Sequence, residues 1–78
     1  MRPYPTAILL CKPTPASLAR PPLVKAAAEG KLWLPAVVQR VSEGWVEVCF
    51  LSEGFKMGER TQVVFEHDEN QTWKWCRP

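Results

Sequence analysis

Four tryptophans are the residues of this 78-residue chain best suited to chemistry, and that chemistry is binding rather than catalysis. They are Trp33, Trp45, Trp73 and Trp75. Rings that line an exposed groove can bind a peptide, a cation or a stacked base, whereas rings in a core or an oligomer interface have no ligand role. Trp73 and Trp75 are two positions apart, so on a strand they would share one face. The sequence leaves open which of the rings face solvent.

The residue types needed for catalysis or metal binding do not form a recognisable group. His67 is the only histidine, and no pattern places a nucleophile or a second metal ligand beside it. Cys11, Cys49 and Cys76 are widely spaced without a C-x-x-C pair, which predicts free thiols rather than a disulfide framework or a zinc site. A glycine-rich phosphate loop is also missing from the sequence. We therefore predict that the protein is not an enzyme and has no cofactor and no metal.

The strands that would position the rings follow from the apolar pattern. Residues 45–51 alternate, which places Val46, Val48 and Phe50 on a core face and the residues between them on the outer face. Further strands are predicted at 32–41, 61–66 and 72–76, with a glycine-containing loop at 52–60 and a polar turn at 67–71. In the strand at 32–41, Pro35 predicts a bulge or a sheet edge.

The first 30 residues are harder to interpret. Residues 1–22 contain six of the eight prolines and predict an extended, polyproline-like arm, in which 6–12 has the apolar content of a short strand able to pair with a sheet edge. Residues 21–30 carry helix signals, namely two prolines, three alanines and a closing glycine. Because β structure follows directly, we predict a strand at 23–28 instead.

Five short antiparallel strands leave long edges open in a flat sheet, and curling them into a barrel removes those edges. The predicted fold is therefore mainly β. It consists of a Pro-rich N-terminal arm, residues 1–22, and a small five-stranded SH3-like barrel, residues 23–78.

Several short motifs follow one another along the predicted barrel. They are Leu23-Val24-Lys25-Ala26, Glu29-Gly30, residues 32–38, Ser42-Glu43-Gly44, Val46-Glu47-Val48-Cys49-Phe50 and the closing Cys76-Arg77-Pro78. In this order they resemble the Tudor and agenet branch of the SH3-like barrels over about 55 residues. The resemblance implies a module that holds a methylated lysine or arginine in an aromatic cage, because a methylated cation keeps its charge but sheds hydration.

The resemblance also implies which residues would contact the ligand. Trp33, Phe50 and Phe55 occupy cage positions, with Glu53 as the acid near the cation. Trp45 and Trp73 are further ring candidates. An alanine, Ala26 or a neighbour, stands where the family has a first aromatic residue, so the expected cage lacks one wall.

Two alternatives remain beside the binding module. The tryptophans and Ile8-Leu9-Leu10 could form a homo-oligomer contact, which would add apolar burial to a small core. Glu53-Gly54-Phe55 and Thr61-Gln62-Val63-Val64-Phe65 also faintly resemble the plasmid-borne type II dihydrofolate reductases. That resemblance implies a tetramer that binds folate and NADPH.

The charge distribution and the apolar runs limit the predicted partners. The net charge is +2, but all four charged residues before Glu29 are basic, and the remainder has eight acids against six bases. Nucleic acid is therefore a disfavoured partner, since its affinity comes mainly from basic residues that neutralise phosphates. A protein or peptide ligand is predicted. No run approaches the roughly 20 apolar residues of a membrane span, and no secretory signal is recognisable, so we expect an intracellular protein.

Overall fold

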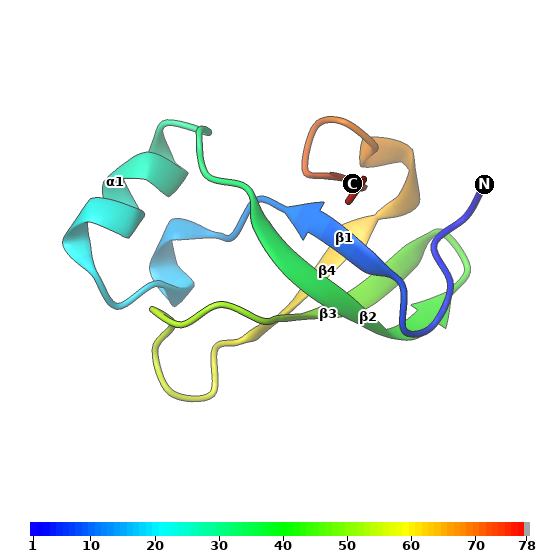
Figure 1. The fold of residues 1–78 in the computed structure, drawn as a ribbon, viewed down its shortest axis with the longest axis horizontal. Helices are drawn as coiled ribbons and strands as arrows, with labels where there is room; N and C mark the ends of the chain where they lie inside the picture. The colour runs from blue at the N-terminus through cyan, green and yellow to red at the C-terminus, as the bar shows by residue number, and fades with distance from the viewer. Residues whose placement is uncertain (78) are drawn as a thin grey trace.

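Apolar residues at every second position allow each strand to place one face against a shared core. In the computed structural model, which describes residues 1–77, the described chain forms a single antiparallel sheet of five strands (Figure 1). The strands are β1 (Ile8–Cys11), β2 (Leu34–Ser42), β3 (Trp45–Phe50), β4 (Thr61–Phe65) and β5 (Trp73–Trp75). They are accompanied by the α-helix α1 (Pro21–Ala28) and the 3₁₀ turns η1 (Pro15–Ser17) and η2 (Glu66–Asp68). Pro78 of the closing Arg-Pro motif lies outside the described residues.

The sheet is bent but is not closed into the predicted barrel, because no strand pairing within residues 1–77 joins its two ends. The strand order is β4-β3-β2-β1-β5, so β4 and β5 are the edge strands. The Gln62 amide of β4 donates to the Lys12 carbonyl at 2.8 Å and accepts from the Thr14 N–H at 3.1 Å. The Trp73 indole of β5 donates to the Phe65 carbonyl of β4 at 2.8 Å. These bonds satisfy backbone groups along the open side of the sheet.

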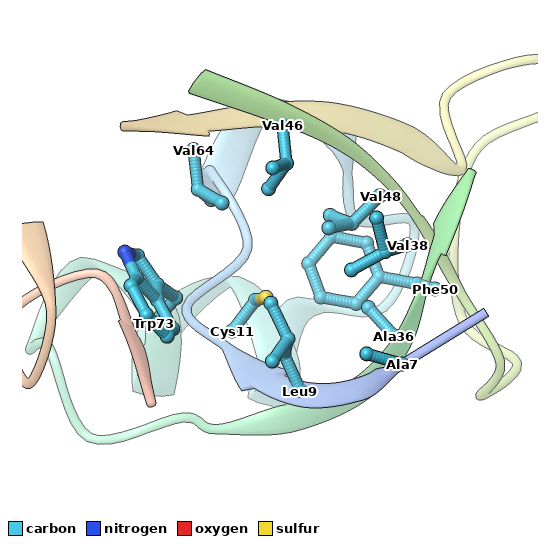
Figure 2. Close-up of a cluster of buried hydrophobic side chains, with 10 residues drawn as sticks. All are labelled: Ala7, Leu9, Cys11, Ala36, Val38, Val46, Val48, Phe50, Val64 and Trp73. Atoms are coloured by element: carbon cyan, nitrogen blue, oxygen red, sulfur yellow. The ribbon is translucent and has the colours of Figure 1, made fainter. Parts of the chain in front are cut away.

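The core lies on the inner face of the bent sheet. Figure 2 shows its side chains converging from all five strands and from the residue before β1. They are Ala7, Leu9, Cys11, Ala36, Val38, Val46, Val48, Phe50, Val64 and Trp73. The predicted alternation along β3 is confirmed, since Val46, Val48 and Phe50 are buried and the residues between them are only partly buried. The mainly β fold class is confirmed as well.

The N-terminal residues belong to the sheet. β1 lies within the predicted arm, and it pairs with β2 on one side, Leu9 opposite Ala36, and with β5 on the other, Leu9 opposite Trp75. A strand at 6–12 was expected to join an edge, whereas β1 is an inner strand. The physical reason is that Leu9 and Cys11 are fully buried, so removing this segment would expose the core.

The strand predicted at 23–28 is wrong, because these residues are in α1. The prolines in the first turn have no N–H that the helix needs, which favours this start. At the other end Gly30 has φ +71°, its N–H donates to the Ala27 carbonyl, and the Lys31 N–H donates to the Ala26 carbonyl. This is a Schellman cap, which requires glycine or another residue that tolerates positive φ. Local helix signals therefore outweighed the surrounding β structure.

The irregularity in β2 does not fall at Pro35. β2 is an inner strand, and Pro35 pairs with Leu10 of β1. The register shift lies between Val38 and Arg40, where β2 turns from its contact with β1 toward its terminal pairs with β3. In Figure 1, α1 lies at one end of the long axis and the N-terminus at the other, so the helix packs beside the sheet rather than over its core.

Candidate functional site

Two of the six predicted ligand contacts are part of the core. Phe50 and Trp73 are each 1% exposed, and Figure 2 shows both rings pointing into the core cluster. A ligand cannot reach either ring without opening the sheet. The resemblance placed Phe50 in a cage, but alternation along β3 and the Trp73 hydrogen bond to Phe65 give both rings structural roles.

Two further tryptophans have cations of this chain over their rings. The Lys12 Nζ lies 5.0 Å and the Lys74 Nζ 4.3 Å from the centre of the Trp33 ring. The Arg40 guanidinium lies 5.6 Å from the centre of the Trp45 ring. Because each ring already has a cation–π partner, a ligand cation would have to compete with a side chain of this chain.

Phe55 and Glu53 lie in the loop between β3 and β4. The Phe55 ring packs on Phe50 at a centroid distance of 4.8 Å, and the Arg60 guanidinium lies 5.7 Å from its centre. Glu53 is exposed. Phe55 therefore anchors the loop to the core, and Glu53 is the one predicted ligand contact that is exposed.

Trp75 is the tryptophan that lines open pockets. It is half-buried, and two adjoining pockets of about 660 and 470 Å³ meet around it. Trp75, Glu69 and Arg77 line both pockets, and Lys74 lines the smaller one. The Tyr4 ring packs at 6.0 Å from the Trp75 ring and is 52% exposed. We call these two pockets the Trp75 groove.

The turn between η2 and β5 shapes the groove. Asn70 has φ +69°, and its N–H donates to the Trp73 carbonyl. This turn directs Glu69 toward the edge of β5, where it lines the groove with Trp75. Sequence reasoning identified the Trp73 and Trp75 pair but did not predict which ring would be exposed. No signal in the sequence identified this ring, because its position beside the pockets arises from tertiary packing.

Comparison of the chain with protein-family models, with curated proteins and with solved structures gives no match. The groove is therefore interpreted from its own residues. An indole face, one carboxylate and two cations can together hold an extended peptide, through apolar contact and charge-assisted hydrogen bonds. Among residues 1–77 there is no group of three or more His, Cys, Asp and Glu side chains that could hold a metal ion. No helix in the described part is long and apolar enough to cross a membrane.

The three cysteines differ in their access to solvent. Cys11 is buried, Cys49 is partly buried and Cys76 is exposed, and all three are free thiols. Burial raises the pKa of the Cys11 thiol to about 12, because the thiolate would lose its hydration in the core. Cys11 is therefore an apolar core residue and not a nucleophile at neutral pH.

The Cys11 thiol gives a prediction about alkaline stability. The unfolded thiol ionises from about pH 9, while the folded thiol stays protonated to about pH 12. The stabilisation by the protonated thiol is fully present below pH 9 and is lost as the pH rises through that interval, at about 1.4 kcal/mol per pH unit. Comparing urea denaturation of the wild type and Cys11→Val from pH 8 to 11 measures it. Parallel stability curves for the two proteins would contradict the prediction.

The two alternative interpretations from the sequence remain predictions. For self-association, Ile8 is 40% exposed, whereas Leu9 is fully buried and cannot contribute to a contact between chains. For the reductase-like tetramer, the Gln62 amide is bonded to the backbone of Lys12 and Thr14 and does not point away from its own chain. Sedimentation over a range of concentrations would distinguish a monomer from either assembly.

Proposed function

We propose that this protein is a non-enzymatic interaction module that binds a peptide in the Trp75 groove. The observation that carries the proposal is the position of Trp75, whose ring lines two adjoining pockets while the other three tryptophans are buried or covered by cations of this chain. A half-buried indole beside charged groups provides apolar contact area at a low cost in side-chain entropy.

We also propose that the bent sheet belongs to the SH3-like barrels, as the sequence resemblance implies. Three features support this assignment. Strands β1 to β4 pair antiparallel, and β2 lies between β1 and β3. Strand β5 returns to pair with β1. A 3₁₀ turn connects β4 to β5. The Trp73 indole of β5 donates to the Phe65 carbonyl of β4 across the remaining opening between these strands, and the Gln62 side chain of β4 bonds to the backbone just after β1. Such a small scaffold presents binding residues on its connections and strand ends.

The charges of the groove disfavour a methylated lysine as its ligand. Arg77 lines both pockets and Lys74 lines the smaller one, against the single carboxylate of Glu69. A methylated lysine would meet two like charges and one opposite charge, on one open ring face. The Trp75 groove therefore favours a peptide whose binding does not require an aromatic cage. A peptide with trimethyl-lysine is included in the test below for comparison.

The test is an NMR titration of the full chain with blocked hexapeptides that are acidic, neutral or basic, the last with and without trimethyl-lysine. We expect at least one peptide to shift the Trp75 indole N–H and the amides from Glu69 to Arg77. Trp75→Ala should weaken that binding by about fivefold or more, since a contacted ring at the centre of a site is worth about 1 kcal/mol or more.

The control is Trp45→Ala, which removes a ring of the same size from the outer face of β3. This variant should bind as the wild type does, because Trp45 lines neither pocket. Amide spectra of each variant establish that it is folded. The proposal is wrong if no peptide in the set shifts the Trp75 indole at millimolar concentration, or if Trp45→Ala weakens binding as much as Trp75→Ala does.

A further inference from the structure

A pair of lysines borders the Trp75 groove and has no acidic partner. Lys12 and Lys74 both contact the Trp33 ring, at 5.0 and 4.3 Å from its centre. The ion pairs among residues 1–77 are Arg2 with Glu66 and His67 with Asp68, so neither lysine is neutralised within the described chain. Two ammonium groups on one ring repel each other, and an external anion would relieve that repulsion.

The lysines are also held in place before any partner arrives. Both are half-buried, and the indole contact restricts their side chains. The capped end of α1 lies beside Lys12, because a Cβ atom at Gly30 would be 3.7 Å from the Lys12 Nζ. A lysine that is already ordered loses less side-chain entropy on binding than a free surface lysine does.

Lys74 connects this pair to the groove. It lines the smaller pocket together with Arg77, Leu10 and Trp75. Three cations, Lys12, Lys74 and Arg77, thus lie in or just after the paired strands β1 and β5, against one carboxylate, Glu69. The local charge is opposite to that of the chain from Glu29 onward, which has more acids than bases.

We propose that the ligand of this surface is an acidic peptide, whose carboxylates bind at Lys12, Lys74 and Arg77 while its backbone and apolar atoms lie against Trp75. This inference rests on the proposed peptide-binding function and names the class of its partner. Carboxylates complement the cations, and Leu10 and Trp75 supply apolar contact between them.

A single-stranded nucleic acid is less favoured by the same residues. The Trp33 ring already carries two lysines of its own chain, and a base that stacked on it would have to compete with them. A continuous phosphate backbone would also extend beyond three cations onto a part of the chain that has a net negative charge. A short acidic segment avoids that repulsion.

The experiment compares blocked hexaglutamate, hexalysine and a six-nucleotide deoxythymidine strand in NMR titrations of the full chain. Hexaglutamate should shift the Trp33 indole N–H and the Lys74 amide, and the double variant Lys12→Gln/Lys74→Gln should weaken its binding about tenfold. The matched control Lys25→Gln/Lys56→Gln removes two exposed lysines away from the site and should change the affinity by about twofold or less. Affinity should fall as salt is raised.

The outcomes separate this inference from the proposed function. If hexaglutamate shifts nothing at Trp33 while a neutral or basic peptide still shifts Trp75, the acidic partner is ruled out and the interaction module stands. Equal weakening by the two double variants would show that binding depends only on the net charge of the protein, and it would overturn the inference. Binding of the deoxythymidine strand in place of hexaglutamate would overturn it as well. If hexaglutamate shifts the Trp33 indole without shifting Trp75, the Trp75 groove is not the peptide site, and the inference that rests on it is overturned as well.

Discussion

Replacing Trp73 with alanine is expected to lower the free energy of unfolding by about 3–5 kcal/mol, the usual cost of removing a large buried ring. Trp73 is among the largest fully buried side chains, and its indole also donates a hydrogen bond to the Phe65 carbonyl. A chain of 78 residues has a total stability of about 4–12 kcal/mol at typical values per residue. The loss is therefore a quarter or more of the total stability, and the variant should unfold at a clearly lower urea concentration than the wild type, as measured by circular dichroism.

Two matched variants separate the causes of this loss. Trp73→Phe keeps an apolar ring but removes the indole N–H, leaving the Phe65 carbonyl without its donor, and should cost about 1–2 kcal/mol. Trp45→Ala removes a tryptophan from the outer face of the sheet and should cost about 1 kcal/mol or less. If Trp73→Ala were no more destabilising than Trp45→Ala, the ring would not be part of the core, and the arrangement of β5 would be wrong.

The strands after residue 30 could be predicted from the sequence because side-chain alternation is a local signal. Along β3 every second residue from Val46 to Phe50 is buried, as the pattern required. The predicted strands at 32–41, 61–66 and 72–76 correspond to β2, β4 and β5 within about two residues at each end. Strand existence depends on residues that are near one another in the chain, so a single sequence was enough.

The role of the N-terminal residues could not be predicted in the same way. β1 has four residues and lies between prolines, and its stability comes from pairing with β2 and β5, which are distant in sequence. The error at α1 has a different cause. Its prolines and its glycine cap are local helix signals, but a strand was predicted because β structure follows in the sequence. In both regions the local pattern indicated the observed element, a short strand within 6–12 and a helix within 21–30. The errors came from assumptions about the structure around these segments.

The candidate site depended even more on long-range packing. Trp33 and Trp75 are similar in sequence terms, since each borders or ends a strand. They differ because Lys12 and Lys74, brought together by β1 and β5, cover the Trp33 ring, while the turn at Glu69 leaves Trp75 beside two pockets. Such differences arise from tertiary pairing, and no spacing rule for one sequence contains them.

Phe50→Ala gives the second large expected effect, a loss of about 3–5 kcal/mol, because the ring is buried between β2 and the loop after β3. The resemblance to Tudor domains predicts the opposite result for an exposed cage residue, namely weakened ligand binding with little change in stability. Chemical denaturation and the peptide titration, applied to the same variant, distinguish the two roles. Phe50→Leu, which retains apolar volume, should lose clearly less stability than Phe50→Ala.

The contact between Phe50 and Phe55 explains how the loss would spread to the loop. Their rings pack at 4.8 Å, and Arg60 both lies over the Phe55 ring and donates hydrogen bonds to the Phe50 and Ser52 carbonyls. A double-mutant cycle of Phe50→Leu and Phe55→Leu should therefore give a coupling energy of about 0.5–1.5 kcal/mol. Additive losses would show that the loop folds independently of the core. In that case Phe55 would be free to contact a ligand, as the sequence resemblance implies.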